Sequence, residues 1–121
     1  MSNYSKAKAK AKQKVDRNRK IQLKTLIENI NHHYTQMPDK PLSAGIALEH
    51  RRTLANFCYT ALIQGFIDRA TSGVLTELFA VTPSPLPNRG YVRPVYYYLM
   101  RSLENELKRL NDEENPEENN D

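Results

Sequence analysis

The chain has 121 residues, of which 26% are charged and 39% are hydrophobic. These proportions are typical of one small globular domain and exclude both a disordered chain and an array of domains. No apolar run approaches the roughly 20 residues of a membrane-spanning helix, and the N-terminal residues lack the apolar stretch of a secretory signal. Because no such segment is present, we expect a protein that does not contact membranes. A single cysteine, Cys58, cannot form an internal disulfide, so we also expect a cytoplasmic protein.

The net charge of +4 is unevenly distributed along the chain. Residues 1–24 contain nine Lys or Arg residues against Asp16 alone, which gives +8. Residues 111–121 contain six acidic residues and no basic one, which gives −6. This separation predicts a basic arm that binds a polyanion and an acidic tail that keeps the chain in solution. The alternative is that both ends are merely solvated, or that they pair with each other.

The first predicted element begins in the basic arm, residues 1–14, where Lys alternates with Ala or Gln. Ala and Lys favour helix, but like charges two residues apart repel, so we expect a frayed arm that becomes helical when its charge is neutralised. Apolar residues at three- and four-residue spacing then predict an amphipathic helix from about residue 15, or earlier, to about residue 34. Its apolar face comprises Leu23, Leu26, Ile27, Ile30 and Tyr34.

A second helix is predicted over residues 44–71, with Ser43 as its N-cap. Apolar residues nearly surround it, which predicts a place at the centre of a bundle, with Gly65 at a close contact between helices. Ser72 and Gly73 are a typical helix-ending pair, so a short third helix is expected over residues 74–80.

Prolines are concentrated in residues 81–93, which predicts a stiff, extended loop. Pro94 suits the first turn of a fourth helix, whose apolar face reaches Leu110. Residues 111–121 lack an apolar anchor and are expected to be a disordered acidic tail. The predicted fold is therefore all-α: a small bundle of three long helices and one short helix over residues 15–110.

Catalytic and metal-binding patterns are not evident. His32 and His33 are neighbours and lie about 100° apart on a helix, which is a poor arrangement for one ion. His50 and Cys58 would lie about 12 Å apart along a helix, too far for a nucleophile and its base. Glycine-rich phosphate loops are also absent from the sequence. We expect a protein that is not an enzyme and needs neither a metal nor another cofactor.

Arginine and tyrosine interleave in residues 89–101, at a junction between loop and helix. Arginine binds phosphate through two parallel hydrogen bonds, and tyrosine stacks on unpaired bases. Arg51 and Arg52 cannot both face a core, so at least one should reach solvent or a partner. The alternative is that residues 89–101 and the pair Arg51 and Arg52 form ordinary solvated surface, with Tyr96 of the first region in the core. The candidate nucleic-acid contacts are Lys8, Lys12, Arg17, Arg19, Lys20, Lys24, Arg51, Arg52, Arg89, Tyr91, Arg93 and Arg101.

Two functions fit these features. The first is a non-catalytic accessory subunit that holds DNA or RNA, through the backbone or as a single strand, within a larger nucleoprotein complex. The second is a protein-interaction module, such as a phage- or plasmid-encoded inhibitor or adaptor, with the acidic tail and the tyrosine-rich loop as contact surfaces. Nucleic-acid binding should weaken steeply as salt rises, which distinguishes the two.

Residues 42–110 also resemble the small helical subunits of CRISPR interference complexes of the Cascade-like kind. The resemblance depends on size, helix order, a basic surface, and the Leu78-Phe79-Ala80 turn followed by a proline-rich loop and a final helix. It implies a role in antiviral defence, with several copies side by side and arginines that hold nucleic acid without cutting it. The Lys/Ala arm and the acidic tail have no counterpart in that family.

Overall fold

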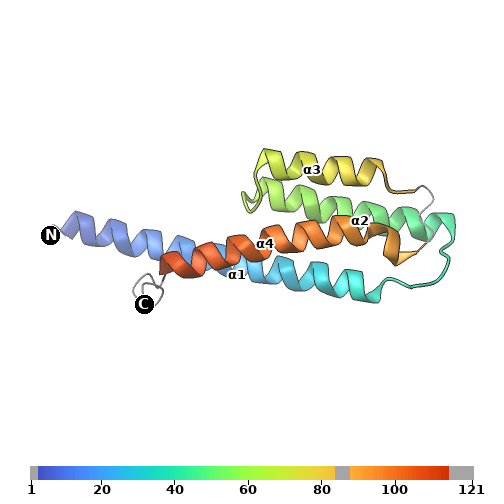
Figure 1. Ribbon diagram of the computed structural model, residues 1–121. Helices are drawn as coiled ribbons and strands as arrows, with labels where there is room; N and C mark the ends of the chain where they lie inside the picture. The colour runs from blue at the N-terminus through green and yellow to red at the C-terminus, as the bar shows by residue number, and fades with distance from the viewer. Residues whose placement is uncertain (1–2, 84–87, 115–121) are drawn as a thin grey trace.

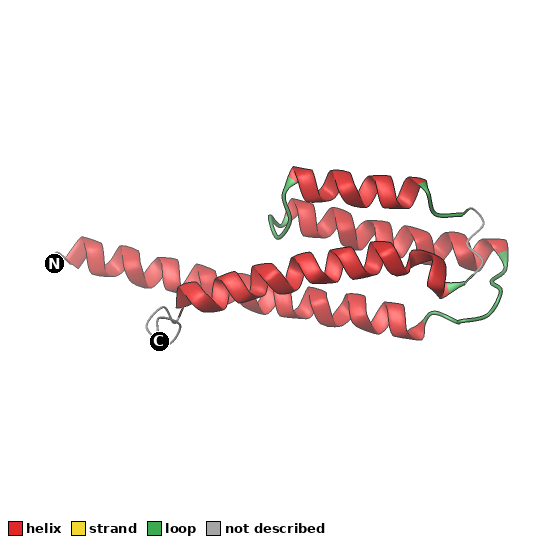
Figure 2. Cartoon of the chain, viewed as in Figure 1, coloured by secondary structure: helices red, strands yellow, loops and turns green. Residues whose placement is uncertain are grey.

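The computed structural model describes residues 3–83 and 88–114, and within them the chain is helical with short connections (Figure 1). The elements are α1 (Asn3–Gln36), α2 (Ala44–Ile63), α3 (Arg69–Ala80), a 3₁₀ helix (Arg89–Val92) and α4 (Arg93–Glu114). These residues contain no strand (Figure 2), which confirms the all-α prediction. In the same residues, no helix has both the length and the apolar character needed to cross a bilayer.

The four α-helices form a bundle in which successive helices run in opposite directions (Figure 1). The main contacts between helices pair α1 with α2 and α4, and α3 with α2 and α4. The pair formed by α1 and α4 is the most extensive of these contacts. Antiparallel neighbours joined by short connections are the expected arrangement of such a bundle.

The core lies where the apolar faces of all four helices meet. Its fully buried large side chains are Leu23, Ile30, Leu54, Leu75, Val92, Val95, Leu99 and Leu103. The apolar faces predicted for the first and fourth helices are buried or half-buried here, which confirms both. Burial of each such side chain contributes about 1.5–3 kcal/mol, so these positions hold the bundle together.

The basic segment at the start of α1 is helical, so the prediction of a frayed arm was wrong. Ala is the best helix former, and lysines two residues apart point to opposite sides of a helix, which weakens their repulsion. The segment also extends a helix that the bundle has already nucleated, so it avoids the cost of a first turn. As a result, α1 projects well beyond the other helices (Figure 1).

The boundary between the second and third helices differs from the prediction. Gly65 has φ +76°, a left-handed conformation that suits glycine, and it ends α2 eight residues before the predicted end at residue 71. Asp68 then caps α3 by accepting a hydrogen bond from the Thr71 N–H at 2.8 Å. Gly65 is thus a helix terminator rather than a packing contact, and Gly73 lies inside α3 rather than at a helix end.

The second helix is not central, contrary to the prediction from its composition. Its buried residues are Ala47, Leu54, Cys58 and Ala61, all on one side. Leu48, Tyr59 and Ile63 are 48%, 64% and 65% exposed. The predicted N-cap is confirmed, since Ser43 accepts a hydrogen bond from the Ile46 N–H. This helix therefore covers the core with one face, and its outer face exposes apolar side chains together with polar ones such as Arg52 and Asn56.

The fourth helix begins at Arg93, so Pro94 stands in its first turn as predicted. It continues to Glu114, four residues into the segment predicted to be a disordered tail. The remaining tail, residues 115–121, and part of the predicted proline-rich loop, residues 84–87, lie outside the described residues.

Candidate nucleic-acid interface

The basic half of α1 presents its charge without contributing to the core. Every side chain described between Asn3 and Val15 is exposed, including the candidate contacts Lys8 and Lys12. Arg17 and Lys24 are also exposed, and Lys20 is half-buried. A helix holds these cations at fixed spacing, so the arm is a rod of positive charge attached to a packed bundle.

Arg19 has a structural role at the point where α1 meets the bundle. Its guanidinium donates to the Gln64 carbonyl at 3.1 Å and to the Gly65 carbonyl at 3.4 Å, and it lies 5.0 Å from the centre of the Phe66 ring. These carbonyls belong to the turn that ends α2, where backbone acceptors lack helical partners. Arg19 therefore anchors the turn to α1, a role that the sequence did not indicate.

Arg51 is occupied in a similar way. Its guanidinium donates to the Phe79 carbonyl at 2.8 Å, to the Thr82 carbonyl at 3.2 Å and to the Pro83 carbonyl at 3.5 Å. A cation at these carbonyls also complements the negative end of the α3 dipole. These bonds engage both terminal nitrogens of Arg51 and hold its guanidinium against the end of α3, which makes it less available for the phosphate contact predicted there. The adjacent Arg52 is exposed on the outer face of α2.

The predicted junction of arginine and tyrosine lies in the 3₁₀ helix and the start of α4. Arg89 pairs with Asp39 at 3.8 Å, and its guanidinium lies 5.6 Å from the centre of the Tyr34 ring. Tyr91 is 48% exposed, and Arg93 is exposed. The junction therefore offers Tyr91 and Arg93 to a ligand, whereas Arg89 mainly ties this end of the bundle to the loop after α1.

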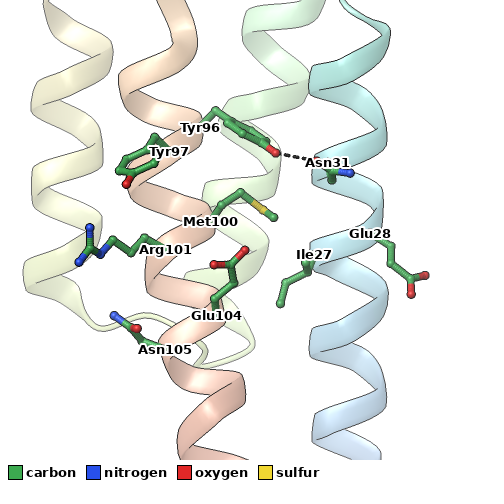
Figure 3. Close-up of a pocket in the computed structure, with 9 residues that line it drawn as sticks. All are labelled: Ile27, Glu28, Asn31, Tyr96, Tyr97, Met100, Arg101, Glu104 and Asn105. Carbon is green, nitrogen blue, oxygen red and sulfur yellow. Dashed lines mark hydrogen bonds between the residues drawn. The ribbon is translucent and has the colours of Figure 1, made fainter.

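The tyrosine predicted to be in the core has a structural contact with α1. Tyr96 is half-buried, stacks on Tyr34 with ring centres 3.8 Å apart, and donates its hydroxyl to Asn31 Oδ1 at 2.7 Å (Figure 3). Burial is the main cause that raises the pKa of Tyr96 above its ordinary value. Tyr96 therefore joins α4 to α1 as a neutral phenol and is not available to stack on a base.

An open groove of about 640 Å³ lies between α1 and α4 near this contact. Glu28 and Glu104 are among its lining residues, and Figure 3 shows Glu104 and Met100 projecting between the two helices. Arg101 and Tyr97 point away from α1 in the same view. Arg101 also lines the groove, at its edge away from α1, but the two carboxylates make the space between the helices unfavourable for phosphate.

No family model, curated protein or solved structure matches this chain.

The acidic end of α4 is partly paired within itself. Arg109 lies between Glu106 and Glu113, one helical turn away on either side, and forms ion pairs with both. The hydrogen bond with Glu106 is the main cause that raises the pKa of Arg109 above its ordinary value. This end of α4 lies beside α1 near the base of the projecting arm (Figure 1). Arg109 therefore offsets part of the negative charge that lies close to the arm.

One side-chain pair escaped prediction from the sequence. His33 of α1 and His50 of α2 form a hydrogen bond between His33 Nε2 and His50 Nδ1 at 3.3 Å, and Phe57 packs edge-on against His33. Burial lowers the pKa of His33, and the neighbouring His50 and His32 lower it further. The sequence signal was weak because the two histidines are separated by the whole connection between α1 and α2.

Cys58 and the histidines do not form a thiol site. Cys58 is buried, as predicted, and burial raises the pKa of its thiol to about 12. Such a thiol is protonated at neutral pH and is therefore a poor nucleophile. Among the described residues, no group of three or more His, Cys, Asp or Glu side chains could hold a metal ion.

Proposed function

We propose that this protein is a non-catalytic nucleic-acid-binding accessory subunit of a larger complex, working in the cytoplasm. One observation carries the proposal: the basic first part of α1, residues 3–15, projects from the bundle, and its described side chains are exposed and take no part in the core. Nine basic residues within residues 1–24 would be a costly self-repulsion for a solvated end alone, but they neutralise a phosphate backbone well.

The proposed contacts follow from exposure. The arm contributes Lys8, Lys12, Arg17 and Lys24, and the bundle contributes Arg52, Tyr91, Arg93 and Arg101, whereas Lys20 is left out because it is half-buried. Arg19, Arg51 and Arg89 are left out because their guanidinium groups already bind carbonyls or Asp39. Contact with the backbone releases counterions, which gives an affinity that falls as salt rises.

The test is fluorescence anisotropy with labelled oligonucleotides over a series of salt concentrations. Replacing Lys8 and Lys12 by Gln should reduce the magnitude of the salt slope by about 1.4–1.8, because two phosphate contacts are lost. The matched control replaces Lys40 and Lys108 by Gln, two exposed lysines outside the arm, and should leave the slope nearly unchanged. Absence of binding to any polynucleotide in dilute buffer, alone or in the native assembly, would refute the proposal.

A second candidate function is a protein-interaction module. It is favoured by the stripe of Leu48, Tyr59 and Ile63 on the outer face of α2, because apolar side chains grouped on one surface often contact a partner. An inhibitor or adaptor would bind its protein partner through these side chains. Replacing Tyr59 and Ile63 by Ser should then abolish binding to the partner, and replacing the arm lysines should leave this binding unchanged.

A protein that works like the small subunits of CRISPR interference complexes would use both the basic arm and the outer face of α2. In that arrangement, copies of the chain would pack side by side through α2, and the basic surfaces would line up along one nucleic acid. Copurification from the native host, with and without nuclease, tests this idea. Partners that leave after nuclease treatment were held by nucleic acid, and partners that stay were held by protein contacts.

A further inference from the structure

The lysines of the arm form two rows on opposite sides of the helix. At about 100° per residue, Lys6, Lys10 and Lys14 fall on one side, and Lys8 and Lys12 fall roughly half a turn away. All five side chains are exposed. The alternation of Lys with other residues thus does not spread charge evenly but builds two parallel rows along one rod.

The two surfaces between these rows differ. One carries Ala7, Ala11 and Val15, which are exposed, small and uncharged. The other carries Ala9 and the half-buried Asp16, a carboxylate that phosphates would repel, with the half-buried Lys20 one turn further along. The first surface, which has no acidic residue and a lysine row on each flank, therefore suits close approach to a polyanion better.

We infer that this half of α1 lies in the major groove of duplex DNA, with Ala7, Ala11 and Val15 toward the base edges. The inference rests on the proposed nucleic-acid binding and names its substrate. The groove of B-form DNA is about 12 Å wide and admits one α-helix. A helix in that groove has a phosphate strand on each side, which matches the two lysine rows, and its small side chains let the backbone approach the bases.

Other nucleic acids fit this geometry less well. The major groove of double-stranded RNA is deep and narrow, so side chains and helices do not enter it readily. Proteins that hold single strands rely on several aromatic side chains as stacking platforms, whereas residues 1–24 contain one aromatic residue, Tyr4. Single-strand binding would also leave the uncharged surface without a function.

The experiment compares two variants of the full chain that add the same charge on opposite surfaces. Ala11→Glu puts a carboxylate in the middle of the groove-facing surface, whereas Ala9→Glu puts one on the surface that faces away. Glu favours helix, so both variants keep the arm helical, and far-ultraviolet circular dichroism checks this. Affinity is measured for one sequence as duplex DNA, single-stranded DNA and duplex RNA.

The expected result is a preference for duplex DNA, a loss of affinity of roughly tenfold or more for Ala11→Glu, and a loss of roughly twofold for Ala9→Glu. A second measurement needs no variant: bound wild-type protein should protect guanine N7, in the major groove, from methylation. Equal binding to all three nucleic acids with equal losses for the two variants would overturn the groove placement and leave the proposed function standing. No binding to any of them would overturn both.

Discussion

Replacing Arg51 by Ala tests whether this arginine stabilises the fold, in contrast to the exposed arginines that are proposed to bind nucleic acid. The Arg51 guanidinium reaches three carbonyls at and just beyond the C-terminal end of α3, at 2.8, 3.2 and 3.5 Å. A hydrogen bond from a charged donor contributes about 1.5–3 kcal/mol. The 3.5 Å contact is marginal and the freed carbonyls can bind water, so we expect Arg51→Ala to lower the free energy of unfolding by about 2–3 kcal/mol in total.

Urea unfolding followed by far-ultraviolet circular dichroism measures this loss directly, and the melting temperature should fall by roughly 4 °C per kcal/mol for a domain of this size. Arg51→Lys should restore less than half of the loss, because an ammonium group lacks the planar fork that binds two carbonyls at once.

The control is the neighbouring residue. Arg52→Ala removes the same charge from the same helix, but from an exposed position, so stability should change by no more than about 0.5 kcal/mol. Affinity for nucleic acid should respond in the opposite way and fall for Arg52→Ala. Equal destabilisation by the two variants would refute the assignment of Arg51 to the end of α3.

Three further predictions concern stability. Gly65→Ala should destabilise the fold by about 1–2 kcal/mol, because the φ of +76° at this position is strained for a residue with Cβ. Gly73→Ala should stabilise the fold by about 0.5–1 kcal/mol, because Gly73 lies inside α3 and an added Cβ would meet no atom within 4 Å. Equal effects of the two variants in urea unfolding would contradict this. Because the pKa of His33 is lowered from 6.5 in the fold, the unfolded chain takes up the proton first, and stability should fall as pH drops below about 6.5. Melting curves from pH 8 to about pH 5 should show a much weaker dependence in His33→Gln and a slightly weaker one in His32→Gln, because His32 is the smallest of the causes that lower the pKa of His33. Leu99→Ala, at a fully buried position, should cost about 2–5 kcal/mol, and a loss under 1 kcal/mol would show that the pairing of α1 with α4 is not central to the core.

The helical faces of α1 and α4 were predictable because their signal is local. Leucine and isoleucine at three- and four-residue spacing mark one side of a helix whatever lies opposite. The same spacing failed for α2, where apolar residues surround the helix and only the packing partners decide which of them are buried. Leu54 and Leu48 look equivalent in the sequence, yet one is buried and the other is 48% exposed.

The misplaced boundary between α2 and α3 has a similar cause. Gly65 and Gly73 both follow apolar helical segments, and composition gave no reason to choose Gly65. A usable signal was present in Asp68, a strong N-cap residue whose carboxylate receives the Thr71 N–H. An Asp shortly after a glycine marks the end of one helix and the start of the next better than Ser72 and Gly73 do.

Some features of the candidate site could be predicted from the sequence and others could not. The charge of the arm and its separation from the apolar face could be predicted, because both depend on residue type and spacing. The roles of Arg19 and Arg51 could not, because each depends on carbonyls brought close by the fold, from residues 28 to 46 positions away. A basic residue in a sequence does not reveal whether its partner is a phosphate or a helix end.

The pairing of α1 with α4 also sets the time at which the chain can fold during synthesis. Leu23 and Ile30 of α1 are fully buried, and α1 makes its most extensive contact with α4, so the early helix has no complete partner until the late one leaves the ribosome. Until then, its leucines and isoleucines are open to chaperones and to other nascent chains. Truncations that remove α4 should therefore produce chains that aggregate rather than smaller folded domains.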